Sequence, residues 1–183
     1  MARVLVFSGG IGSERSKLSQ SVAKAVGWKH AKFSDVIRRR LEKAGEDATR
    51  SKLQSFGQDM VQNDLEAFVA AVLEDAEFAK ADGCVIDGLR HIEVLLELRD
   101  QAGAAVVDYV HVNEDLNQIE QSAEDRGIEE QNLFRYNRAL SEAQVPRILP
   151  AYANLELDAS DGLALNTGKV LRRFGLEPSA DAD

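Results

Sequence analysis

The feature that most constrains the fold is an apolar segment, then glycines, then an amphipathic segment, all at the start of the chain. Residues 3–8 (RVLVFS) have the β-branched and apolar side chains of a buried strand, and Gly9 and Gly10 follow them. After SGGIGSERSKLSQ (8–20), apolar residues recur at helical spacing. A glycine-rich loop between a strand and a helix favours the binding of an anion, because backbone N–H groups and the positive end of the helix dipole point at the bound ion. A phosphate-binding loop is therefore expected here.

The rest of the chain alternates between strand and helix patterns. Ser34 or Asp35 is expected to cap the helix that Gly45 ends. Alternation of this kind predicts an α/β fold with three layers, α/β/α, around a parallel five-stranded sheet. The further strands are expected at 28–34, 83–87, 105–112 and 154–158, and the further helices at 36–45, 49–80, 92–103, 114–145 and 163–175.

Length, charge and cysteine content limit the class of protein. The 183 residues predict a single domain over 1–175 with a disordered tail at 176–183. The net charge of −9 disfavours bulk nucleic-acid or membrane binding, so any anion site must be local. Cys84 is the one cysteine, and neither a signal peptide nor a long apolar run is found. A cytoplasmic location is therefore the default expectation.

The wider loop FSGGIGSERSKLS resembles the phosphate loop of dephospho-coenzyme A kinases and nucleoside monophosphate kinase-like proteins, in which GGIGSGKS is typical. The resemblance implies a P-loop NTPase fold, ATP or another nucleoside triphosphate as donor, and Mg²⁺ as cofactor. It makes the loop a degenerate Walker A motif, because Glu14 replaces the last glycine and Arg15 replaces the lysine. The implied donor cradle is Gly10, Ile11, Gly12, Ser13, Glu14, Arg15, Ser16 and Lys17.

The two substitutions leave two interpretations open. If the loop is a rebuilt cradle, Glu14 must turn outward or pair with a nearby Arg or Lys, because its carboxylate would repel a triphosphate. If the loop is a remnant, restoring Gly at position 14 and Lys at position 15 should tighten nucleotide binding. An ordinary glycine-rich turn is the remaining alternative.

A second motif is VIDGLRHIEVLLELR (85–99). Its acidic residue ends an apolar strand, where ligands of parallel sheets gather, so Asp87 is expected to hold Mg²⁺ together with Ser16. The motif resembles the DG-x-R element of the same kinases, which places Arg90 at the acceptor. Alternatively, Asp87 caps the next helix and Arg90 is a surface charge. His91 is the one histidine expected near the site.

Three further groups fit a kinase-like pocket by resemblance. FSDVIRRR (33–40) resembles the acceptor-binding segment of nucleotide kinases, within expected acceptor helices at about 34–80. TRSKLQSFGQD (49–59) resembles a segment of uncharacterised ATPase-like and deoxynucleotide kinase-like members, whose residues approach a base or sugar; an ordinary helix start is the equal alternative. A lid-like segment is expected at about 120–145, although salt-bridged surface helices are an equal alternative. The implied acceptor-binding residues are Asp35, Arg38, Arg50, Gln54, Gly57, Arg90 and Arg138; the implied catalytic residues are Arg15, Asp87, Arg126 and Arg135.

Taken together, these motifs predict phosphoryl transfer from a nucleoside triphosphate to a small, nucleotide-like phosphorylated acceptor. The alternative is a catalytically weak or inactive nucleotide-binding protein that kept the fold. Glu14 and Arg15 favour the second, whereas Asp87, Arg90 and the lid arginines favour the first.

Overall fold

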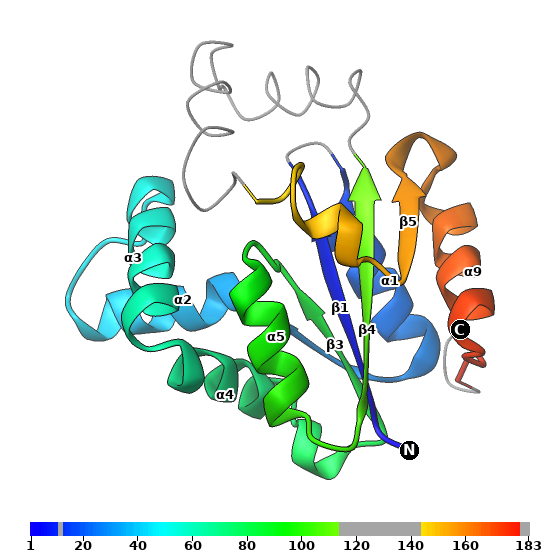
Figure 1. The fold of residues 1–183 in the computed structure, drawn as a ribbon, viewed down its shortest axis with the longest axis horizontal. Coiled ribbons are helices and arrows are strands. Elements are labelled where there is room, and N and C mark those ends of the chain that lie inside the picture. Colours follow the sequence, from blue (N-terminus) through cyan, green and yellow to red (C-terminus); the bar gives the residue numbers. More distant parts are fainter. Residues whose placement is uncertain (11–12, 114–143, 180–183) are drawn as a thin grey trace.

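The computed structural model describes residues 1–10, 13–113 and 144–179, and within them the core is a five-stranded parallel sheet (Figure 1). The strand order is β2-β3-β1-β4-β5, and each neighbouring pair is parallel. The predicted α/β class and five-stranded parallel sheet are therefore confirmed. The strands are β1 (Arg3–Gly9), β2 (Lys29–Lys32), β3 (Gly83–Asp87), β4 (Val106–Asn113) and β5 (Leu155–Asp158).

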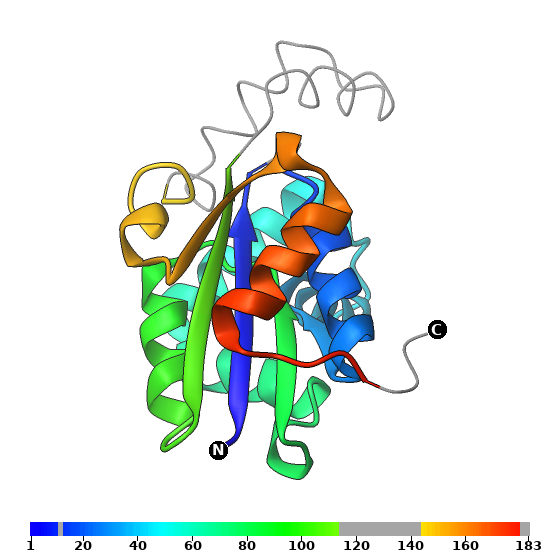
Figure 2. The same cartoon turned by 90° about the vertical axis from the view of Figure 1, so that its right-hand side faces the viewer.

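Helices cover both faces of this sheet. Figure 2 shows α5 on one side of the sheet and α1 and α9 on the other. Parallel strands need such crossover helices, and both faces become buried as a result. The helices are α1 (Arg15–Val26), α2 (Phe33–Lys43), α3 (Arg50–Asn63), α4 (Leu65–Asp75), α5 (Ile92–Gln101) and α9 (Leu163–Phe174); short 3₁₀ turns lie at Phe78–Lys80, Leu149–Tyr152 and Ala159–Asp161.

The central strand β1 separates two apolar cores. Val4 and Val6 point into the core beneath α2, α4 and α5, whereas Leu5 and Phe7 point into the core beneath α1 and α9. All four side chains are fully buried. The uninterrupted apolar run of β1 thus serves both faces, which is why it shows no polar alternation.

Three local predictions differ from the structure. Helix α2 begins at Phe33, directly after β2, and no side chain caps it at Lys32, so the predicted Ser34 or Asp35 cap is wrong. The helical segment predicted at 49–80 is broken at Asp64, whose φ and ψ of −150° and 37° lie outside the helical range. At the beginning of the segment predicted to be a disordered tail, Ser179 N donates to Ala25 O near the end of α1 (2.7 Å), so this part of the segment contacts the helix.

The lid-like segment expected at 120–145 lies almost entirely outside the described residues. Val145 and Leu149, just beyond it, are buried in the core next to α5. Among the helices described, none is long and apolar enough to cross a membrane.

Candidate functional site

The site lies at the carboxyl edge of the sheet, where β1 ends at Gly9 and β3 ends at Asp87. After β3, the chain turns sharply, and the Gly88 and Leu89 amides both donate to Phe7 O (3.1 Å each). Gly88 has a φ of +101°, which side-chain-bearing residues rarely adopt. These contacts hold Asp87 and the following residues beside the glycine loop, because the ends of neighbouring parallel strands meet at one edge.

The loop enters α1 through Glu14, in a conformation that normally favours glycine. Glu14 has a φ of +51° and a ψ of 14°, the left-handed region, and it stands where the resemblance predicts glycine. Its carboxylate pairs with Lys17 on the surface, and no side chain caps the helix. The structure therefore has the outward pairing that a rebuilt cradle requires.

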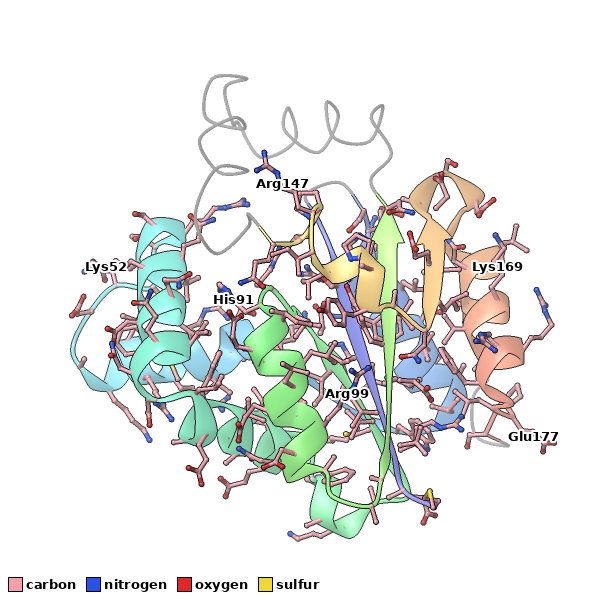
Figure 3. The ribbon with its side chains drawn as sticks, in the orientation of Figure 1. Lys52, His91, Arg99, Arg147, Lys169 and Glu177 are labelled. Carbon is pink, nitrogen blue, oxygen red and sulfur yellow. The ribbon has the colours of Figure 1, made fainter. Side chains whose placement is uncertain are left out.

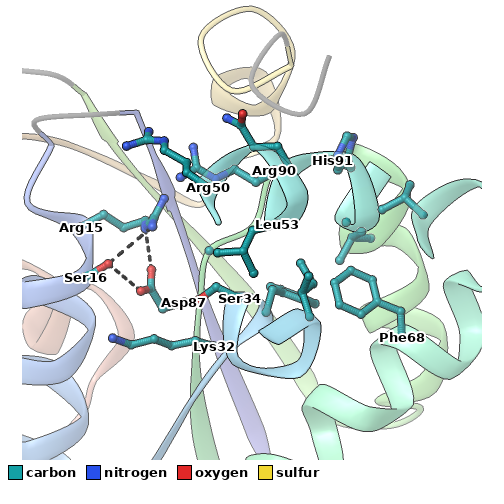
Figure 4. A pocket seen from close by; sticks show the side chains of 17 residues that line it. Arg15, Ser16, Lys32, Ser34, Arg50, Leu53, Phe68, Asp87, Arg90 and His91 are labelled. Carbon is teal, nitrogen blue, oxygen red and sulfur yellow. Dashed lines mark hydrogen bonds and ion pairs between the residues drawn. The ribbon is translucent and has the colours of Figure 1, made fainter. Parts of the chain in front are cut away.

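The Arg15 side chain turns back toward the sheet. Its Nε donates to Asp87 Oδ1 (2.5 Å), and its Nη1 donates to the Gly9 carbonyl (2.9 Å). Ser16 Oγ donates to the other carboxylate oxygen of Asp87 (2.7 Å) and lies 3.4 Å from Arg15 Nη2 (Figure 4). The side chains are 13% exposed for Arg15 and 3% for Asp87. The result is a nearly buried, charge-neutral pair at the start of α1.

This arrangement does not fit the predicted metal site. Both carboxylate oxygens of Asp87 already accept hydrogen bonds, one from Ser16 and one from the Arg15 guanidinium. The guanidinium stands where a cation would approach the carboxylate. Within the described ranges, no cluster of three or more His, Cys, Asp or Glu side chains is able to hold a metal ion.

A cavity of about 340 Å³ opens beside this pair, between the strand ends and helices α2, α3 and α5. Arg50 and Arg90 lie at the same end of the cavity as Arg15, and Phe68 lies at the other end (Figure 4). Four cationic side chains and one carboxylate give the lining a net formal charge of +3. The charged lining residues are Arg15, Lys32, Arg50, Arg90 and Asp87.

Apolar side chains form another part of the cavity lining. They are Phe33, Ile37, Leu53, Val61, Phe68 and Val94. Phe68 lies at the end of the cavity away from Arg15 (Figure 4). The Nε2 atom of Gln54, which also lines the cavity, is buried and has no hydrogen-bond partner among the described residues. Buried amide nitrogens are rarely left unpaired, so this atom is available to a ligand that has a hydrogen-bond acceptor.

The structure brings some predicted acceptor residues together and leaves others apart. Arg50, Gln54, Gly57 and Arg90 all line the cavity. Asp35 and Arg38 pair with each other on exposed α2 (2.9 Å) and are not in the lining. Outside the described residues lie Ile11, Gly12, Arg126, Arg135 and Arg138.

Lys32 is a lining residue that sequence analysis missed. The register of β2 against β3 puts Lys32 opposite Asp87. The sequence shows only that Lys32 follows a short strand pattern, so its place beside Asp87 emerges once the strand order is known.

Burial shifts the pKa values of His91, His111 and Cys84. His91 directly precedes α5 (Figure 3) and lines the cavity; burial, and to a lesser extent Arg90, lowers its pKa. His111 Nδ1 and Tyr109 Oη lie 2.9 Å apart, and burial lowers the pKa of His111 to about 4. Burial raises the pKa of Cys84 to about 12, which keeps it an unreactive thiol.

Comparisons with known proteins show the fold. No protein-family model matches the chain, and no curated protein matches it in sequence. Among solved structures it resembles an unliganded sugar kinase from Janibacter sp. HTCC2649, at 16% identity and a TM-score of 0.57, over 96% of this chain and 95% of that one. It also resembles a gluconokinase from Sinorhizobium meliloti 1021, at 17% identity and 0.61, over 94% and 91%.

A shikimate kinase from Acinetobacter baumannii in complex with shikimate is similar at 12% identity, with a TM-score of 0.59, over 96% and 94% of the two chains. All three similar proteins are small-molecule kinases, and the described sheet and helices match their P-loop fold. Similarity at this level of identity establishes the fold alone. The chemistry has to be inferred from the residues of the site.

Proposed function

We propose that this protein is a P-loop phosphotransferase-like protein that binds a nucleoside triphosphate at the glycine loop and a small phosphorylated acceptor in the adjoining cavity. The proposed reaction moves the terminal phosphoryl group of the triphosphate to the acceptor and releases the diphosphate. The kinase fold supports the reaction class, and the geometry of the site supports the ligand class.

The observation that carries this proposal is the charge of the cavity. The chain as a whole has a net charge of −9, yet the cavity lining has a net formal charge of +3. Positive side chains gathered in a concave site raise the local concentration of anions and bind phosphate through charge-assisted hydrogen bonds. Two phosphorylated molecules that meet at the loop would need such a surplus.

The apolar end of the cavity supports a nucleotide-like acceptor. A phosphate held by Arg50 and Arg90 would leave the rest of the molecule against Phe68 and the other apolar side chains. Gln54 Nε2 would then donate to an acceptor atom on that body. A heterocyclic ring has both the apolar faces and the polar edge that this combination suits.

The loop would bind the donor through backbone N–H groups at the start of α1, because the outward Glu14 leaves that end without a side-chain cap. Ser16 and Asp87 are not left to hold magnesium, since Asp87 accepts hydrogen bonds from both Arg15 and Ser16. Arg15 and Arg90 both donate to the Gly9 carbonyl, at 2.9 and 3.4 Å, so they converge where donor and acceptor would meet.

One observation favours a second candidate, a nucleotide-binding protein without catalysis. The Arg15 guanidinium is tied to Asp87, whereas catalysis of phosphoryl transfer needs a positive group directed at the transferred phosphoryl. If the pair persists with ligands bound, the site would bind both molecules and transfer little.

The deciding experiment combines binding with a chemical readout. ATP and a panel of nucleoside 5′-monophosphates and dephospho-coenzyme A are titrated into the protein by calorimetry, and ³¹P NMR then follows mixtures of ATP with each acceptor that binds. The proposed function predicts a diphosphate and a newly phosphorylated acceptor in equal amounts. Binding of both ligands without new phosphorus signals supports the second candidate. Absence of binding by ATP and by every acceptor would overturn both.

The matched control for this experiment is Lys52→Ala. Lys52 lies on α3 near the cavity helices but is exposed and pairs with Glu46 (3.1 Å). The Lys52→Ala variant should bind the ligands as the unmodified protein does. The Arg50→Ala variant, changed at the first residue of the same helix, should lose affinity for the acceptor.

A further inference from the structure

The pair formed by Arg15 and Asp87 has a consequence for how the loop neutralises a polyphosphate. We propose that the Arg15 guanidinium takes the place of a divalent metal ion in the donor site, so that polyphosphate binding at the loop does not require Mg²⁺. The inference rests on one part of the proposed function, that the 9–16 loop binds a polyphosphate, and it holds whether or not transfer follows.

The contacts of Arg15 are those that a bridging cation would make. Its guanidinium binds the Asp87 carboxylate, the Gly9 carbonyl and the Ser16 hydroxyl, which are all oxygen atoms. Hard divalent cations prefer the same kind of oxygen ligands. A fixed side-chain cation and a free metal ion would therefore compete for one position.

Arginine can serve this role because of its shape. The planar guanidinium has more N–H donors than its three protein contacts use, so donors remain for a phosphate oxygen. A lysine ammonium is a compact point charge on a flexible stem and cannot span Asp87, Gly9 and a phosphate in one plane. Arginine at position 15, where the resembled kinases have lysine, therefore lets one side chain bind Asp87, Gly9 and a phosphate oxygen together.

The surrounding charge disfavours a metal ion as well. Once Arg15 and Asp87 neutralise each other, the remaining charged lining residues are Lys32, Arg50 and Arg90, all cations. Glu14 is the one further carboxylate in the described part of the loop, and it faces Lys17 on the surface. A divalent ion at Ser16 would be repelled by these cations, and neither Asp87 nor Glu14 would be left to bind it, because each is paired with a basic side chain.

The electrostatics also predict the sign of the magnesium effect. Free ATP is more negative than its magnesium complex, so a cavity with surplus positive charge should bind the free form at least as tightly. A metal-dependent loop has the opposite preference, because there the ion links the phosphates to protein oxygens. The two possibilities differ in direction, which makes them separable by a binding measurement alone.

The test measures ATP dissociation constants by calorimetry in EDTA and in excess Mg²⁺. The unmodified protein should bind ATP as tightly in EDTA as in Mg²⁺, or more tightly. Arg15→Met exposes the phosphates to the Asp87 carboxylate, so its binding in EDTA should weaken about tenfold or more, and Mg²⁺ should now tighten it. Arg15→Lys, which keeps the charge and the fold, should shift in the same direction by less.

The matched control is Arg39→Met, which breaks an Arg–Asp pair outside the cavity, that of Arg39 with Asp75. It should keep the unmodified protein's preference for EDTA. Binding by the unmodified protein that Mg²⁺ tightens about tenfold or more would overturn the inference and leave the proposed function standing. So would an unchanged magnesium effect in both Arg15 variants. If neither ATP nor inorganic triphosphate binds in either buffer, the donor site itself is refuted, and the inference with it.

Discussion

Arg15 Nε lies 2.5 Å from Asp87 Oδ1, which joins the first residue of α1 to the last residue of β3 across 72 positions of sequence. The pair ties the helix that follows the glycine loop to the strand beside it. The same carboxylate also accepts the Ser16 hydroxyl, so Asp87 organises the loop even without a ligand.

The first prediction concerns the stability of this pair. Arg15→Met should lower the free energy of unfolding by about 3 kcal/mol, because it leaves a nearly buried carboxylate without its counter-charge. Asp87→Asn in the same background should recover part of that loss, so the two changes should be non-additive by about 1–3 kcal/mol. Urea denaturation of both single variants and the double variant measures this coupling. Additive losses would mean that the pair contributes nothing to folding.

The second prediction separates strain from charge at Glu14. Glu14→Gly and Glu14→Ala both remove the carboxylate and its surface pair with Lys17, but only glycine relieves the left-handed φ of +51°. The glycine variant should therefore be more stable than the alanine variant by about 1 kcal/mol. Their ATP affinities should be equal and modestly above that of the unmodified protein. Equal stabilities in thermal unfolding would contradict the strained conformation.

The third prediction concerns the acceptor end of the cavity. Arg90→Ala should weaken binding of the phosphorylated acceptor about tenfold or more and weaken ATP binding less, because a charge-assisted hydrogen bond to phosphate contributes about 1.5–3 kcal/mol. Calorimetric titration with each ligand gives the two ratios. Arg39→Ala, on the exposed face of α2, should change neither. Equal losses of both ligands in the Arg90 variant would show that it does not discriminate between donor and acceptor.

The fourth prediction is a pH dependence of stability that arises from His111. Burial, with a smaller contribution from Arg15, lowers its pKa to about 4 in the folded protein, from 6.5 for an exposed histidine. Protonation therefore favours the unfolded chain. The stabilisation is complete above pH 6.5 and is lost as the pH falls toward about 4.

At pH 5 this linkage should cost about 2 kcal/mol relative to pH 7. His111→Gln keeps a hydrogen-bonding partner for the Tyr109 hydroxyl but cannot titrate, so its free energy of unfolding should fall by about 2 kcal/mol less over that range. Urea denaturation at the two pH values measures the difference. Parallel losses in both proteins would show that His111 is not the responsible group.

Residue order along the chain predicts the sheet and the edge at which the site forms. The unbroken apolar run at 3–8 is typical of a strand buried on both faces, and the structure buries Val4, Leu5, Val6 and Phe7 completely. Parallel strands end at one edge, so a glycine loop after one strand and Asp87 after another are expected at the same edge of the sheet. These features depend on periodicity and on strand direction, which the order of residues encodes locally.

Which side chains face the cavity depends on how the chain packs. Arg15 turns inward to Asp87 while Glu14 turns outward to Lys17, although the two are adjacent in sequence. Lys32 reaches the site through the register of β2 with β3, and Arg38 remains on the surface although its sequence context resembles an acceptor-binding segment. Such outcomes depend on rotamers, on strand order and on charges contributed by distant segments. Local sequence patterns do not contain them, because the interaction energies arise only after the chain has packed.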